Sequence, residues 1–323
     1  MYILHNIDYT ITAILELAPL PFISSPHSFP CIFCVMAKTN PDDPSTNPGR
    51  INVKAFEQID ATANVQDYVH ILDVFDSLDG IQRLKKAAIE RGRIRPGLSV
   101  LDNGCGVGLE TIKLARLVAP SGQVTGLDYS RKFLDEAQRR AAGLNLPITY
   151  RQGDAQQLPF SNGTFDVSRS ERLFPYLSDP RQALTELIRV TKPDGYIYLI
   201  EPDFETVTIN LTDRSLVRKV LHYDCDHHTK NGWIGRELPG LFKSCGLLDI
   251  AVEASVVVFE PEGFGAYFLE IGRAAAQSQV ITAQELKRWE DDIHGLHDAH
   301  ELFCTISYFM VAGRLREGSR QEA

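Results

Sequence analysis

Apolar and polar positions alternate in blocks along the chain from about residue 96 onward. Short apolar runs bounded by Gly, Asp or Asn predict strands, and stretches with apolar residues at three- and four-residue steps predict helices. The predicted strands are 99–104, 123–128, 148–154, 165–171 and 195–202. The helices between them are 111–119, 131–142 and 180–191. This alternation predicts a doubly wound parallel sheet.

The remaining part of the chain continues the pattern with longer segments. We predict helices at 238–247, 263–277 and 282–296 and two further strands at 249–260 and 302–315. The fold class is therefore predicted as α/β: a Rossmann-like, seven-stranded, mostly parallel sheet with helices on both faces and a helical lid.

Four regions follow from the composition along the chain. Residues 1–35 are apolar and proline-rich without any Lys or Arg, which fits neither a secretory signal nor a transit peptide. We expect residues 1–48 to be disordered or to be an upstream extension of the gene model. Residues 49–95 have helical periodicity and predict an amino-terminal helical lid. The core is predicted at 96–317, with lid insertions at 204–234 and 261–300 and a short tail at 318–323.

Charge and cysteine content exclude several classes of partner. The formal net charge is -9 and no block rich in Lys or Arg is present, so nucleic acid is not expected as a partner. No apolar run reaches the roughly 20 residues that span a bilayer. The six cysteines lack the spacing of a disulfide scaffold, which suits a reducing compartment and predicts a cytoplasmic protein. A homodimer is one assembly that we allow for.

The first predicted strand ends near Asp102. Three glycines follow it, at positions 104, 106 and 108. Bare backbone at the carboxyl edge of a parallel sheet allows a ligand to approach closely. Two cofactors compete for this pattern, a dinucleotide and S-adenosylmethionine, and the GxGxG spacing differs from the dinucleotide GxGxxG. Tight packing between helix and strand is the structural alternative. Asp128 ends the second strand, where a carboxylate binds ribose hydroxyls in both classes.

Further segments carry a family resemblance over about residues 66–314. The chain resembles class I S-adenosylmethionine-dependent methyltransferases of the small-molecule branch, with a methyltransferase type 11/25-like domain. The matching segments are VLDNGCGVG at 100–108, GDAQQLPF at 153–160, DP at 179–180, RVTKPDG at 189–195, EPD at 201–203 and WIGREL at 233–238. The chain departs from the family pattern at Asp194, where a glycine is usual, and at Arg172, which could tune the acceptor pocket.

The resemblance implies S-adenosylmethionine as the cofactor and assigns residues to its adenosine part. Asp128 would bind the ribose and Tyr129 would pack on the adenine. Asp154 and Ala155 would recognise the adenine edge.

Other residues are assigned to the methionine part of the cofactor. Gly104 and Gly106 would face the methionine, and Asp102 would order the loop near its ammonium group. Ser170 would lie near the methionine end. Tyr68 is a candidate for closing over the methionine carboxylate, and ordinary packing of an aromatic residue in the lid is its alternative.

The expected reaction is methyl transfer to a small-molecule acceptor, in specialised natural-product or quinone-type metabolism, with oxygen favoured over nitrogen or carbon. A hydroxyl acceptor would gain from a base, and the stretch 221–228 offers several candidates. We favour His227 or His228 as the catalytic base, because an unperturbed imidazole pKa near 6.5 suits proton removal at neutral pH. A solvated helix surface is the alternative for this stretch.

The sequence allows two other interpretations of its chemistry, a rearrangement and a metal site. A protein that binds S-adenosylmethionine and uses the sulfonium charge to catalyse a rearrangement would share these motifs and transfer no methyl group. Histidines at 294, 297 and 300 lie at three-residue steps, yet no recognised ligand set is complete, so no metal is predicted.

Overall fold

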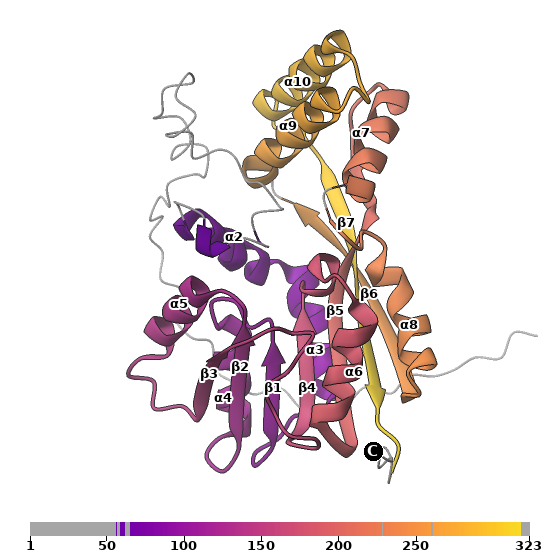
Figure 1. Ribbon diagram of the computed structural model, residues 1–323. Helices are drawn as coiled ribbons and strands as arrows, with labels where there is room; N and C mark the ends of the chain where they lie inside the picture. Colours follow the sequence, from indigo (N-terminus) through magenta and orange to yellow (C-terminus); the bar gives the residue numbers. More distant parts are fainter. Residues whose placement is uncertain (1–55, 57–58, 62–64, 228, 260, 318–323) are drawn as a thin grey trace, which may run out of the picture.

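The structure is a computed structural model that describes residue 56 and residues 59–61, 65–227, 229–259 and 261–317 (Figure 1). Several predictions lie outside these residues: the disordered or extended segment 1–48, the tail 318–323 and the base candidate His228. They stay predictions.

A seven-stranded sheet with the order β3-β2-β1-β4-β5-β7-β6 forms the centre of the molecule. The strands are β1 (Ser99–Asn103), β2 (Gln123–Asp128), β3 (Ile148–Gln152), β4 (Phe165–Glu171), β5 (Thr191–Ile209), β6 (Leu248–Phe259) and β7 (Cys304–Arg314). Strands β1 to β5 pair in parallel, whereas β7 is antiparallel to both β5 and β6. The predicted fold class is confirmed.

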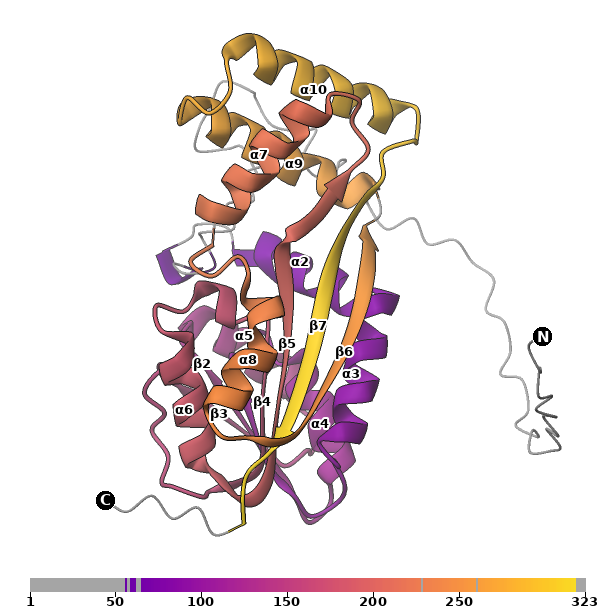
Figure 2. The same ribbon diagram turned by 90° about the vertical axis from the view of Figure 1, so that its right-hand side faces the viewer.

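Helices lie on both faces of this sheet and above one end of it (Figures 1 and 2). They are α2 (Val65–Ser77), α3 (Asp79–Arg91), α4 (Leu109–Val118), α5 (Arg131–Ala141), α6 (Pro180–Val190), α7 (Arg214–His227), α8 (Ile234–Ser244), α9 (Pro261–Gln277) and α10 (Ala283–Asp298). Side chains alternate between the faces of a strand, so Val100 packs with α3 and α4 while Leu101 packs with α6 and α8. Continuous apolar runs in the strands are the sequence signature of this double burial.

Local capping sets where several helices begin. Ser130 starts α5, and its Oγ accepts a hydrogen bond from the Phe133 amide at 3.1 Å. Asp179 does the same for α6 with the Gln182 amide at 2.9 Å. Such caps satisfy amide groups that lack a partner within the first helical turn. Both helices therefore begin directly after a loop that follows a strand, as the doubly wound topology requires.

Strand β5 is longer than its pattern predicted. The expected strand ended at residue 202, but β5 runs for 19 residues to Ile209. Its extension pairs with β7 through Thr208 and Thr305 and through Ile209 and Cys304, after an irregularity that follows Asp203. The long strands reach beyond the core and carry α7, α9 and α10 above it (Figure 2). The helical lid is thus mounted on the sheet itself.

The lid helices α9 and α10 pack against each other. Trp289 of α10 is fully buried, and its indole Nε1 donates a hydrogen bond to the Phe268 carbonyl of α9 at 2.7 Å. Gly272 of α9 lies directly under this ring, because an added Cβ would come within 2.4 Å of it.

Within the described part of the chain, no helix is both long and apolar enough to cross a bilayer.

We expect Gly108→Ala to destabilise the fold more than Gly143→Ala. Both glycines have left-handed φ values, +77° and +78°, which cost an L-residue roughly 1–2 kcal/mol. A Cβ at Gly108 would also lie 2.4 Å from the Tyr150 hydroxyl and 2.9 Å from Ala137 Cβ. A Cβ at Gly143 would have no neighbouring atom within 4 Å. This overpacking should add about 1–3 kcal/mol.

Thermal unfolding of the two variants measures the difference. Each kcal/mol corresponds to about 2–4 °C in Tm for a domain of this size class. Equal losses in Tm at the two positions would show that the contacts at Gly108 are not tight.

Candidate functional site

The glycine loop between β1 and α4 is held by the backbone of β2. The amides of Gly104 and Cys105 donate to the Leu127 carbonyl at 2.7 and 2.9 Å. Gly104 and Gly106 have φ values of +75° and +52°, and a Cβ at Gly104 would lie 2.9 Å from the Leu173 side chain. The loop therefore requires glycine, and it presents bare backbone to the space above the strand ends.

Asp128 fixes the other side of this loop. Its carboxylate accepts hydrogen bonds from the Gly106 amide at 2.8 Å and the Ser130 amide at 2.9 Å. A carboxylate has about four lone-pair sites, so two amide donors leave capacity for a ligand. Burial raises the pKa of Asp128 to about 6, and the two amide hydrogen bonds act against this rise.

A cavity of about 840 Å³ lies at this edge of the sheet. Gly104, Gly106, Asp128 and the segment 153–156 line one end of it. Tyr129 also lines this end and is 71% exposed, so its ring is available to pack on a planar ligand. The Asp154 carboxylate accepts from the Gln156 amide at 2.8 Å, which shapes the loop after β3. Four residues assigned to the adenosine part thus meet at one end of the cavity, together with the glycine loop.

The other end of the cavity is apolar and aromatic. Its lining comes from α2, the extended parts of β5, β6 and β7, and α9, which are far apart in the sequence. The aromatic members are Phe75, Phe204, Phe259, Tyr267, Phe268 and Tyr308. Side chains from the lid and the sheet therefore line a second part of the same cavity, which we call the aromatic compartment.

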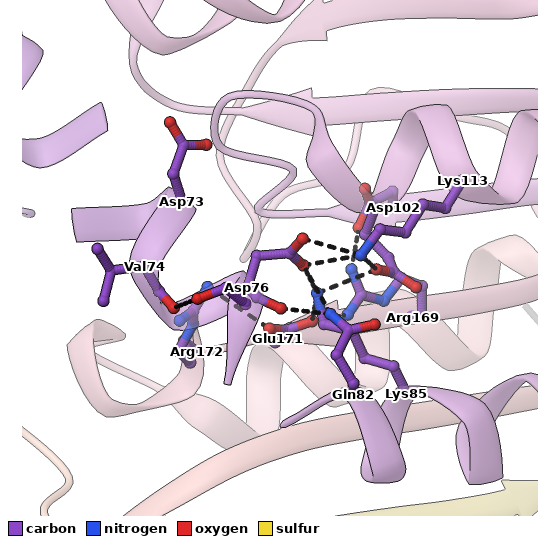
Figure 3. Close-up of polar contacts among 12 residues, drawn as sticks. Asp73, Val74, Asp76, Gln82, Lys85, Asp102, Lys113, Arg169, Glu171 and Arg172 are labelled. Carbon is purple, nitrogen blue, oxygen red and sulfur yellow. Dashed lines mark hydrogen bonds and ion pairs between the residues drawn. The ribbon is translucent and has the colours of Figure 1, made fainter. Parts of the chain in front are cut away.

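A buried network of charges lies at the cavity wall, and Figure 3 shows its polar contacts. Lys85 of α3 lies 2.6 Å from Asp76, 3.0 Å from Glu110 and 3.1 Å from Glu171. Although its burial favours the neutral form, the three carboxylates raise the pKa of Lys85 above its usual value. Arg169 extends the network, with ion pairs of 2.7 Å to both Asp102 and Glu171.

Asp102 and Ser170 lie beneath the cavity and not in its lining. Asp102 is fully buried beneath the loop, where it accepts from Thr111 at 2.6 Å and binds Arg169, and it does not line the cavity. Ser170 is also fully buried, because alternation along β4 turns it away from the face that carries Arg169 and Glu171. Neither side chain lines the cavity. The roles of Asp102 in ordering the loop and of Ser170 near the methionine end stay predictions.

Tyr68 belongs to a small apolar cluster beside the cavity. It is buried and makes an edge-to-face contact with Phe56 at 5.1 Å, in a cluster that includes Val107 and Phe133. The neighbouring Asp67 and Ile71 of α2 line the cavity instead. The structure packs Tyr68 in this cluster, and closure over the methionine carboxylate stays a prediction.

His227 lies outside the cavity. Its ring is exposed, stacks on Tyr223 at 4.6 Å and is within 3.0 Å of the Tyr223 carbonyl through Nδ1. On the buried face of the same helix, the Asp224 carboxylate accepts a hydrogen bond from the Tyr267 hydroxyl. Tyr267 lines the cavity, so Asp224 is hydrogen-bonded to a residue of the cavity wall. His227 contacts Tyr223 instead, which does not line the cavity.

No group of three or more potential metal ligands comes together among the described residues. His294, His297 and His300 lie at the end of α10 and just after it, away from the residues that line the cavity.

Comparison with known proteins decides between the cofactor classes. A family profile described as a methyltransferase domain matches residues 101–199, the region of the glycine loop, Asp128 and the loop after β3. The chain is a class I S-adenosylmethionine-dependent methyltransferase. Its cofactor is S-adenosylmethionine. The cavity end around Gly104, Gly106 and Asp128 offers bare backbone and a carboxylate that accepts only two amide hydrogen bonds among the described residues, which suits this ligand.

The chain is also similar to three individual proteins. An uncharacterized 37.1 kDa protein in transposon TN4556 of Streptomyces fradiae is 31% identical over 269 residues, which cover 82% of this chain and 75% of that protein. The demethylmenaquinone methyltransferase of Lactobacillus johnsonii is 39% identical over 119 residues, or 36% of this chain and 49% of that enzyme. The crystal structure of the YcgJ protein from Bacillus subtilis shares the fold, with a TM-score of 0.52 at 18% identity over 73% of this chain and 100% of that chain.

We expect Asp128→Ala to weaken binding of S-adenosylhomocysteine to the methyltransferase by roughly 10²- to 10⁴-fold. Two charge-assisted hydrogen bonds to ribose hydroxyls would contribute about 1.5–3 kcal/mol each, and every 1.4 kcal/mol is tenfold in affinity. Isothermal titration calorimetry measures the change. Asp135→Ala, on the exposed surface of α5, serves as the control and should keep the affinity within about twofold. An unchanged affinity in Asp128→Ala would remove the ribose assignment.

Proposed function

We propose that this methyltransferase transfers the methyl group of S-adenosylmethionine to an oxygen of a small, ring-containing acceptor of quinone or natural-product type. The aromatic compartment carries the proposal, because it continues directly from the glycine loop where the cofactor binds. An apolar pocket with a few polar groups is typical of sites for small organic ligands.

Similarity to a demethylmenaquinone methyltransferase supports a quinone-type acceptor. That relative covers only part of the chain, so it supports the cofactor-binding core more strongly than the acceptor compartment. The size of the cavity agrees with this class, since about 840 Å³ lies within the usual range of about 300–1,000 Å³ for ligand pockets.

The reaction needs an acceptor oxygen in line with the bond between sulfur and the methyl carbon. The oxygen–carbon bond forms as the carbon–sulfur bond breaks, and S-adenosylhomocysteine leaves. Holding both reactants in one cavity supplies the alignment. The acceptor hydroxyl must also lose its proton, and a base within hydrogen-bond reach assists this step.

Tyr267 and Asp224 are the pair that we assign to this proton. The phenol oxygen of Tyr267 would accept the acceptor proton while its own proton moves to the Asp224 carboxylate, to which it already donates. Burial first, and then the neighbouring Asp224, raises the pKa of Tyr267 well above its usual value. Tyr267 therefore stays a phenol between turnovers and acts only as a relay to the carboxylate.

Mass spectrometry of a metabolite extract incubated with the enzyme and methyl-deuterated S-adenosylmethionine tests the function. The expected product is a small molecule that gains one trideuteromethyl group, with S-adenosylhomocysteine formed in equal amount. A product of unchanged formula that needs the cofactor but does not consume it would instead indicate a rearrangement catalysed by the sulfonium charge.

We expect Tyr267→Phe to lower turnover of the acceptor found in that screen by roughly 10²- to 10⁴-fold, the range for loss of general-base catalysis. Affinity for S-adenosylhomocysteine should not change. His227→Ala is the matched control on the lid and should keep turnover within about twofold. If His227→Ala loses turnover and Tyr267→Phe keeps it, the assignment of Tyr267 and Asp224 is wrong and His227 is the base.

A further inference from the structure

Arg172 holds an unusual position at the end of β4. Its φ is 51°, in the left-handed region that favours glycine, and its amide donates to the Ile200 carbonyl at 3.0 Å. Strained residues of this kind persist where the surrounding structure holds them and often occur at ligand-binding sites. The backbone turn lets Leu173 lie over Gly104 and sends the Arg172 side chain into the cavity lining.

The guanidinium of Arg172 is the least satisfied cation of the buried network (Figure 3). Its Nη2 lies 3.5 Å from Glu171, a carboxylate already shared by Lys85 and Arg169. The buried Nε and Nη1 atoms have no hydrogen-bond partner within the described residues. A guanidinium has five N–H donors and accepts carboxylates or other oxyanions in a planar fork, so these donors can bind a ligand.

The surroundings of Arg172 belong to the aromatic compartment of the cavity. The guanidinium lies 4.8 Å from the ring centre of Phe75, and Phe75 contacts Phe259 of β6 edge to face at 5.8 Å. Burial raises the pKa of Tyr308 on β7, and the Arg172 charge acts against this rise, so the two groups interact. Strands β6 and β7 lie on the opposite side of β4 from β2, which carries Asp128.

We propose that Arg172 binds an anionic oxygen of the acceptor, a phenolate, enolate or carboxylate, and thereby selects anionic ring compounds over neutral ones. The proposal deepens the proposed function, because it names the charge of the acceptor in the same cavity. Phe75 lies against the guanidinium and limits its orientation at the cavity wall. An anion there would complete the hydrogen bonding that the protein leaves open.

The test uses two probes of nearly equal shape, 1-naphthoate and 1-naphthamide, which differ in charge. Isothermal titration calorimetry on the complex with S-adenosylhomocysteine should give at least about tenfold tighter binding of the naphthoate, as expected for a charge-assisted contact. This comparison needs only the native enzyme. Equal binding of the two probes, or no binding of the naphthoate, would overturn the proposal.

Variants then assign the preference to Arg172. Arg172→Met should remove the preference for naphthoate, and Arg172→Lys should keep part of it, because the charge stays and the fork is lost. Arg83→Met, which removes an equal charge from α3 outside the cavity lining, should leave the preference unchanged. An equal loss in Arg83→Met would mean that overall charge causes the effect, and the proposal would be wrong.

The cofactor carboxylate is the competing ligand for Arg172. If Arg172→Met weakens S-adenosylhomocysteine about tenfold and leaves the naphthoate preference intact, the arginine binds the cofactor and the proposal is overturned. The binding assay requires no methyl transfer. Absence of a methylated product would therefore contradict the proposed function without deciding the role of Arg172.

Discussion

The buried ion-pair network around Lys85 is the constraint on which the rest of the site depends. Its ammonium group comes from α3, and its three carboxylate partners come from α2, α4 and β4. The Lys85 side chain is only 5% exposed, so this charge is stable only with its partners in place. The network therefore fixes the amino-terminal helices against the sheet edge. In doing so it sets one wall of the cavity in which cofactor and acceptor meet.

This arrangement explains how one cavity can serve two ligands. The parallel half of the sheet provides the glycine loop and Asp128, which suit the cofactor, and the antiparallel half provides long strands that carry the lid. Strand β4 lies between the two halves, and its end carries Glu171 and Arg172. Under the proposed function these charged groups lie between the cofactor and the acceptor, while the aromatic compartment stays apolar.

The core and the cofactor end were predictable because their signals are local. Apolar runs gave the strands, and the glycines with Asp128 lie directly at strand ends, where topology brings them together. Lys85 and Arg169 gave no such signal, since each is an ordinary charge until the fold places distant carboxylates beside it. The extension of β5 was missed because its pairing depends on β7, about a hundred residues later. On α7 the spacing of the buried Val220, Leu221 and Cys225 could have indicated that Asp224 faces inward and His227 does not.

The free energy of unfolding of Lys85→Met at pH 7 tests the central claim most directly. Methionine keeps much of the side-chain volume and removes the charge, which leaves buried carboxylates without their shared partner. Removing one member of a buried ion pair typically costs about 3–5 kcal/mol, and the account predicts a loss in this range from denaturant unfolding. A loss below about 1 kcal/mol, the level of an exposed ion pair, would contradict the claim that this network holds the site together.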